Sequence, residues 1–246
     1  CPTSGSATNT GVSSNAPLAD IQAALDASTL DAGDTVYVDG GTYTNSFAIT
    51  YRDQGTVGRP MIVQGSTNWR SGITVLDRKS PSSDPVSFFV VSDARVSDMV
   101  VKSGRYGVFF QTANRCEAVR IYSMSNSAGF RGAAATLNSM TRCAAVRNTT
   151  GLENFDSGNT WDQGVLLDNT FAVSISAAAG LSISNSVISG GTSAYSLQAP
   201  LSGDYNAYFN TTVGGGFSSL YELQRTRTNS WNSSYFDPQF FNGTGL

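Results

Sequence analysis

Two ten-residue stretches in the middle of the chain have almost the same pattern. "NRCEAVRIYS" begins at residue 114 and "TRCAAVRNTT" at residue 141, a step of 27 residues. "ARVSDMVVKS" joins them at a step of 20 if Arg95 and Val96 are aligned with Arg115 and Cys116. Repeats of this length are typical of solenoids, in which each repeat forms one coil stacked on its neighbours. The repeat therefore predicts stacked coils.

Glycines and short apolar segments support the same fold. Gly107, Gly129 and Gly151 recur every 22 residues, and segments such as "FAITY", "MIVQG" and "SFFVV" are separated by turn signals. In the copy that starts at Cys116, the inward and outward alternation slips by one after Ala118, which indicates a corner between two strands. Asparagines are expected to form hydrogen bonds from coil to coil at such corners, and the candidates are Asn126, Asn148, Asn169 and Asn185.

Composition excludes two classes of partner. The net charge is −3, with two lysines, no histidine and no basic run, so the chain lacks the electrostatic footprint of a nucleic-acid-binding protein. No apolar run approaches the roughly 18 residues of a membrane span. At 246 residues, one all-β domain over residues 15–246, preceded by an extended lead-in over residues 1–14, accounts for the whole length.

The opening and the tail of the chain resemble a known superfamily. "PLADIQAALDASTLDAGDTVYVDGGTYTNSF" is similar to the start of pectate-lyase-like right-handed parallel β-helix domains, and "SYFDPQFFNGTG" is similar to their closing segment. The resemblance implies an all-β fold, a right-handed parallel β-helix with a short N-terminal capping α-helix. Helical spacing of Leu18, Ile21 and Leu25 places that helix within residues 18–27, with Asn15 as the expected cap.

The superfamily contains both enzymes and passive modules, so the fold alone does not select a function. Members of the polygalacturonase type use a histidine and an Arg-x-Lys sequence, and this chain has neither. Lyase members remove the C5 proton of a uronate with Lys or Arg, while Ca²⁺ or basic groups neutralise the carboxylate. The residues that would do this here are Lys102, Arg105, Arg120 and Arg131 on consecutive coils.

The repeat also predicts stacked arginines. Arg115 would lie about 4.8 Å from Arg142, and Arg120 the same distance from Arg147, because this is the spacing of neighbouring strands. Like charges directly opposite each other destabilise a sheet. Either Glu117 compensates them or a bound anionic sugar does.

Residues 151–164, "GLENFDSGNTWDQG", read as a loop that leaves the solenoid. Trp161 next to Asp156 and Asp162 is the combination that sugar sites use, with the ring stacking on a pyranose and the carboxylates binding hydroxyls or Ca²⁺. The same two carboxylates are candidates for an acid and base pair. The alternative is a plain surface turn with Trp161 packed onto the coil.

Cys116 and Cys143 occupy the same position of the repeat and would therefore be neighbours on adjacent coils. At one strand spacing they are within reach of a disulfide, and the alternative is a column of two buried thiols.

Two functions are consistent with these residues. The preferred interpretation is an extracellular or cell-surface module without catalytic activity, which binds a polysaccharide or cell-surface glycan or is a structural part of a larger or self-assembling protein. The alternative is a polysaccharide lyase or glycoside hydrolase acting on an acidic polysaccharide. No cofactor or metal site is predicted, and Ca²⁺ is the one ion that the resemblance allows.

Overall fold

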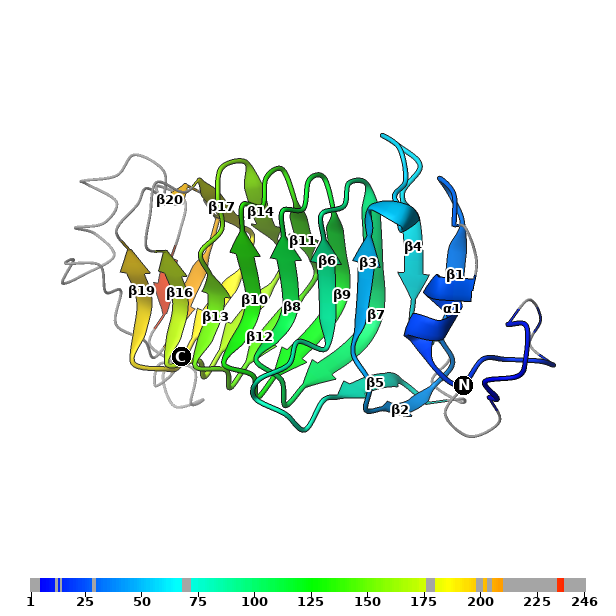
Figure 1. Ribbon diagram of the computed structural model, residues 1–246. Coiled ribbons are helices and arrows are strands. Elements are labelled where there is room, and N and C mark those ends of the chain that lie inside the picture. Colours follow the sequence, from blue (N-terminus) through cyan, green and yellow to red (C-terminus); the bar gives the residue numbers. More distant parts are fainter. Residues whose placement is uncertain are drawn as a thin grey trace.

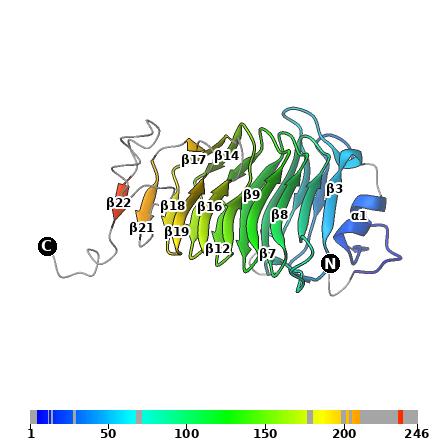
Figure 2. The same cartoon turned by 60° about the vertical axis from the view of Figure 1, so that its left-hand side comes forward.

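The structure, a computed structural model, is a parallel β-helix with one short helix at its N-terminal end (Figure 1). It describes residues 5–11, 13, 15–27, 30–67, 72–175, 180–197, 201–202, 205–209 and 234–236. The fold expected from the repeat and the resemblance is therefore confirmed. Figure 2 shows α1 (Ile21–Ala27) at one end of the stack and the last described strands at the other.

Each coil contributes strands to three sheet faces, and all pairing between these strands is parallel. Face 1 consists of β1 (Thr35–Tyr37), β4 (Met61–Gln64), the first halves of β7 (Ala94–Lys102) and β9 (Glu117–Met124), β11 (Ser139–Thr141), β14 (Asn159–Asp162), β17 (Leu181–Ser184) and β20 (Leu201–Ser202). Face 2 consists of β2 (Gly41–Tyr43), β5 (Thr74–Asp77), the second halves of β7 and β9, β12 (Ala144–Val146), β15 (Val165–Leu167), β18 (Val187–Ser189), β21 (Ala207–Phe209) and β22 (Ser234–Phe236).

Face 3 is the row of strands at the front of Figure 1. It consists of β3 (Phe47–Thr50), β6 (Val86–Phe89), β8 (Tyr106–Gln111), β10 (Ala128–Ala133), β13 (Thr150–Glu153), β16 (Phe171–Ile175) and β19 (Ser193–Leu197). A 3₁₀ turn, η1 (Tyr51–Asp53), follows β3.

The coil length in the middle of the chain is 22 residues. Arg95 pairs with Glu117, and Glu117 pairs with Ser139. The glycine spacing had this period, whereas the alignment of the three similar stretches at steps of 20 and 27 is wrong. Those stretches are alike because strands in different positions of a coil share the same small and β-branched inward residues, and similarity of pattern does not determine the register.

The cysteine prediction fails for the same reason. Both Cys116 and Cys143 are free and buried. Cys116 belongs to face 1, where its N–H donates to Asn138, while Cys143 lies beside Ile121 at the start of face 2 and its sulfur accepts from the Ile121 N–H at 3.4 Å. They do not share a position in the coil, so the buried-thiol alternative describes them and the disulfide does not.

Asparagines connect the coils at the corner between faces 2 and 3. The Oδ1 of Asn148 accepts from the N–H of Asn126 at 2.9 Å, and the Oδ1 of Asn169 accepts from the N–H of Asn148 at 2.9 Å. All three side chains are buried, as predicted. Asn185 does not belong to this ladder, because it lies at the corner between faces 1 and 2 with φ of 51°.

Glycine is required beside this asparagine ladder. A Cβ on Gly129 would lie 2.7 Å from the carbonyl oxygen of Gly151 and 3.0 Å from the Asn148 amide nitrogen. Gly107 and Gly151 are equally crowded by the next coil. The 22-residue glycine spacing therefore records a column in which side chains have no room.

The capping helix begins at Ile21 rather than at Leu18. Asp20, not Asn15, caps it, because Asp20 Oδ1 accepts from the N–H groups of Gln22 at 2.7 Å and Ala23 at 3.4 Å. Ile21 and Leu25 are buried against the first coil, so the helix covers the end of the apolar core. No helix in the described part of the chain is long and apolar enough to cross a membrane.

Candidate functional site

Faces 1 and 2 present different chemistry to solvent. Outward positions of face 1 are mainly polar, and they are Arg95, Glu117, Ser139, Thr141, Thr160, Asp162, Ser182 and Ser184. Outward positions of face 2 are mainly apolar, and they include Val100, Tyr122, Ala144, Val165 and Val187. Face 1 is therefore the surface with hydrogen-bonding groups for a polar ligand.

One residue per coil in the left-handed region forms the corner between faces 1 and 2. We call these residues the corner row, and they are Asp98, Arg120, Arg142, Gln163 and Asn185, with φ between 51° and 62°. Positive φ is uncommon for residues other than glycine, so no glycine marks this corner in the sequence. The corner row runs along one edge of face 1, next to its outward hydroxyl groups.

Two arginines are neighbours in the corner row but have different partners. Arg120 binds Asp98 of the previous coil through two hydrogen bonds, of 2.5 and 2.8 Å. Burial raises the pKa of Asp98, but hydrogen bonds from Arg120 and Ser97 outweigh it, so the pKa is lowered and the pair stays ionised. The exposed Arg142 instead donates from Nε to the neutral Gln163 at 3.0 Å, and it lacks an ion-pair partner among the described residues.

The predicted stacking of Arg115 on Arg142 and of Arg120 on Arg147 is wrong, because it used the step of 27. Arg115 pairs with Asp93 at 2.7 Å, at the corner between faces 3 and 1. Arg147 lies at the corner between faces 2 and 3, with Asp168 at 3.9 Å. Glu117 pairs with Arg95, not with the two arginines that flank it in sequence. Carboxylates one coil away therefore compensate Arg95, Arg115 and Arg120.

The four residues proposed as a basic cluster do not converge. Lys102 points out from face 2 and pairs with Asp77 at 3.2 Å. Burial raises the pKa of Asp77, but hydrogen bonds from Lys102 and Ser103 lower it below its usual value, which favours the ionised pair. Arg105 and Arg131 belong to face 3 and pair with Asp84 and Glu153. Of the four, only Arg120 lies next to face 1.

Residues 151–164 do not form a loop that leaves the solenoid, because they contain most of β13 and all of β14. Trp161 is 0% exposed and packs edge-on against Phe130, with ring centroids 5.2 Å apart, so it cannot stack on a sugar. Asp156 accepts from the Ala135 N–H at 3.0 Å and stabilises a turn. Asp162 points out from face 1 and binds Asn185 at 2.7 Å.

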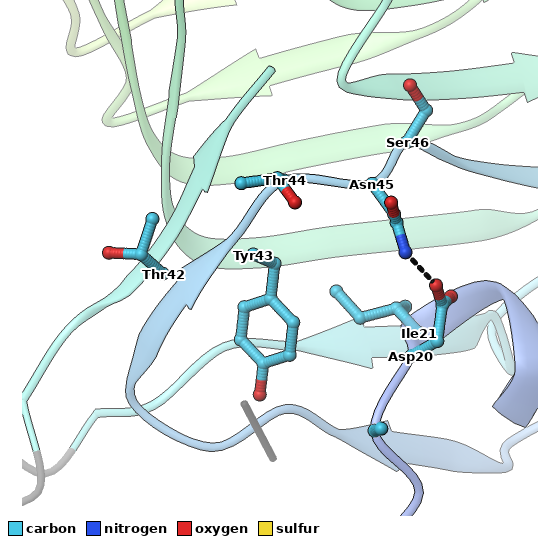
Figure 3. A pocket seen from close by; sticks show the side chains of 8 residues that line it. Asp20, Ile21, Thr42, Tyr43, Thr44, Asn45 and Ser46 are labelled. Carbon is cyan, nitrogen blue, oxygen red and sulfur yellow. Dashed lines mark hydrogen bonds between the residues drawn. The ribbon is translucent and has the colours of Figure 1, made fainter. Parts of the chain in front are cut away.

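A small pocket of about 190 Å³ lies between the start of α1 and the β2–β3 turn (Figure 3). Its carboxylate is occupied, because Asp20 caps α1 and also accepts from the Asn45 amide. Burial, followed by the Asp39 carboxylate, raises the pKa of Tyr43 to about 12. These contacts join the cap to the first coil. No three acidic, cysteine or histidine side chains in the described ranges converge as a metal site would require, so these residues do not fit Ca²⁺.

Solved structures with the same fold are polysaccharide lyases. The pectate lyase Pel9A matches with a TM-score of 0.70 and 15% identity, covering 95% of this chain and 72% of that one. A rhamnogalacturonan lyase matches at 0.64 and 15%, covering 86% and 73%. An alginate lyase from Paenibacillus sp. str. FPU-7 matches at 0.57 and 15%, covering 77% and 73%. No family model and no curated protein matches the sequence. The chain thus has the β-helix fold of these lyases.

The residues that sequence reasoning missed are Asp98, Gln163 and Asn185. They join Arg120 and Arg142 only through the 22-residue register, since each is one coil from the next. An alignment on the glycine spacing would have placed Asp98, Arg120 and Arg142 in one row.

Proposed function

We propose that this protein binds an acidic polysaccharide along face 1, and that Arg142 receives a carboxylate of the polymer. The observation that carries the proposal is the difference between the two neighbouring arginines of the corner row. Arg120 is compensated by Asp98, whereas the exposed guanidinium of Arg142 has only the neutral Gln163. An anion bound there would meet a cation whose fork of N–H groups fits a carboxylate.

The shape of face 1 suits a linear polymer. Its strands are stacked at about 4.8 Å, so equivalent outward groups repeat along the solenoid axis at a regular interval. Ser139, Thr141, Thr160, Ser182 and Ser184 provide hydroxyl groups over four consecutive strands. A polysaccharide lying along the axis would meet a hydroxyl or charged group at every coil. Such polymers are extracellular, and we place the protein outside the cell as part of the same proposal.

The structural matches support polysaccharide as the ligand class, because the matched proteins are lyases named for pectate, rhamnogalacturonan and alginate. They also favour the enzyme alternative over the module without catalytic activity that the sequence led us to prefer.

Binding is tested by titration calorimetry with polygalacturonate, alginate and a neutral glucan. We expect the two anionic polymers to bind and the neutral one not to. Arg142→Gln should weaken binding roughly tenfold, in line with the loss of about 1.5–3 kcal/mol for a hydrogen bond to a charged group. The substitution is compatible with the backbone, because Gln163 already occupies the next position of the corner row at φ of 53°.

The matched control is Arg147→Gln. Arg147 is also left-handed, with φ of 52°, but it lies at the corner between faces 2 and 3. It should bind both polymers as tightly as the wild type. Equal weakening by the two substitutions would show that only overall charge matters, and an unchanged affinity of Arg142→Gln would refute the proposal.

Cleavage is the second candidate function, and the lyase matches are the observation that favours it. In a β-elimination, the C5 proton leaves, the C4–O bond breaks and a 4,5-unsaturated uronate forms. Neutralising the carboxylate acidifies the C5 proton, and Arg142 is placed to do so. Absorbance of the unsaturated product is the readout. Turnover that is lost in Arg142→Gln but kept in Arg147→Gln would establish the lyase, and binding without turnover would establish the module.

A further inference from the structure

We infer that Tyr37 is a sugar-stacking residue at the N-terminal end of face 1, so that the bound polymer segment extends from Tyr37 to Arg142. This inference rests on the proposed function and adds the position where the binding surface ends and the length of polymer that it holds.

The register places Tyr37 in the same outward column as the residue next to Arg142. Tyr37 pairs with Gln64, Gln64 with Ser97, Ser97 with Val119 and Val119 with Thr141. Side chains alternate along a strand, and the preceding Val36 packs against the core. The Tyr37 ring therefore points out from face 1, in line with the Thr141 hydroxyl.

Tyr37 is 79% exposed, the highest fraction among the exposed large hydrophobic side chains of the described residues. Keeping an aromatic ring in water leaves apolar surface unburied, and such rings commonly mark binding sites. The apolar face of a pyranose covers a ring of this kind while the sugar hydroxyls stay hydrated. Because side chains stand roughly perpendicular to a sheet, the ring forms a wall across the end of face 1.

The register also gives the length of the bound segment. Tyr37 and Thr141 are separated by four strand steps, which is roughly 19 Å. A pyranose chain advances by about one strand spacing per sugar, so about five sugars are needed to contact both Tyr37 and Arg142. Shorter fragments can contact only one of them.

The test is a titration with oligogalacturonates and oligomannuronates of defined length, from two to eight sugars. For the wild type, Kd should fall until about five sugars and then level off. Tyr37→Ala should bind fragments of five or more sugars roughly five- to tenfold more weakly, as expected for the loss of one aromatic stacking contact. It should bind two- and three-sugar fragments as the wild type does, because these engage Arg142 alone.

Two variants control for other effects. Tyr37→Phe keeps the ring and should retain most of the length dependence. Tyr122→Ala removes an exposed tyrosine from face 2, where Tyr122 is 40% exposed, and should change nothing. Circular dichroism of Tyr37→Ala verifies the fold, which should persist because the ring is outside the core.

The outcomes separate this inference from the proposed function. If Tyr37→Ala binds long fragments like the wild type while Arg142→Gln weakens fragments of every length, the Tyr37 inference is wrong and the proposed function stands. If no fragment of either series binds the wild type, both are overturned.

Discussion

Trp161 and Tyr37 have opposite environments, although both belong to short strands of face 1. Trp161 alternates with the outward Thr160 and Asp162 and is buried, whereas Tyr37 is preceded by the inward Val36 and is exposed. The sequence predicted the direction of Tyr37, because Val36 and Val38 were assigned to the other side of its strand. It failed for Trp161, because residues 151–164 were taken as a loop, where alternation does not apply.

The two buried thiols make the stability of the protein depend on alkaline pH. Burial raises the pKa of both Cys116 and Cys143 to about 12, while an unfolded thiol titrates near 8.5. Between these values the unfolded state loses protons that the folded state keeps. The free energy of unfolding should therefore be unaffected below about pH 8.5 and fall as the pH rises above it, by up to about 1.4 kcal/mol per pH unit for each thiol.

Urea unfolding from pH 7.5 to 10.5 measures this slope. The variant Cys116→Ala/Cys143→Ala should be less stable at neutral pH, because two small cavities form, but its stability should decline less steeply with pH. Cys1 is present in both proteins and does not affect the comparison. Parallel declines would mean that the thiols do not titrate as described.

At the scale of elements, the corners explain what could and could not be predicted. The ladder of Asn126, Asn148 and Asn169 was predicted, because asparagine at glycine-marked corners is a recognisable signal. The corner row was not, because its left-handed positions hold Arg, Asp, Gln and Asn rather than glycine. Those side chains find their partners one coil away, so their contacts depend on the register and not on local sequence.

Asn148 is the central member of its ladder, and replacing it should be costly. Its Oδ1 accepts from Asn126 N–H, and its Nδ2 donates to the Ser123 carbonyl at 3.2 Å and to Asn169 Oδ1 at 3.1 Å. Asn148→Ala leaves these buried groups without partners, so the free energy of unfolding should fall by at least about 2 kcal/mol.

Chemical denaturation measures the loss, with Thr160→Ala as the control. Thr160 is an exposed outward residue of face 1, and its replacement should change stability by less than about 0.5 kcal/mol. A similar small effect for Asn148→Ala would mean that the ladder contributes little to holding the coils together.

At the scale of the whole molecule, the fold was predictable because several independent signals agreed. The opening motif, the glycine period and the series of short strands all indicated a capped parallel β-helix, which the structure has. The site was less predictable, since five residues up to four coils apart form the corner row. An error of a few residues in the register, such as the step of 27, moves a side chain to another face or corner.

The three faces divide the labour of the solenoid surface. Face 1 is polar and bordered by Arg142, face 2 is apolar, and the charges of face 3 are paired, as in Arg105–Asp84 and Arg131–Glu153. Only face 1 combines outward hydroxyl groups with an exposed arginine that lacks a carboxylate partner among the described residues. The central claim is therefore that an acidic polysaccharide lies along face 1.

A crystal structure of the wild-type chain with a uronate oligosaccharide of about six sugars tests this claim most directly. The account predicts sugar density along face 1, parallel to the solenoid axis, with a carboxylate within hydrogen-bond distance of the Arg142 guanidinium. An oligosaccharide bound on face 2 or face 3, with Arg142 still bonded only to Gln163, would contradict it.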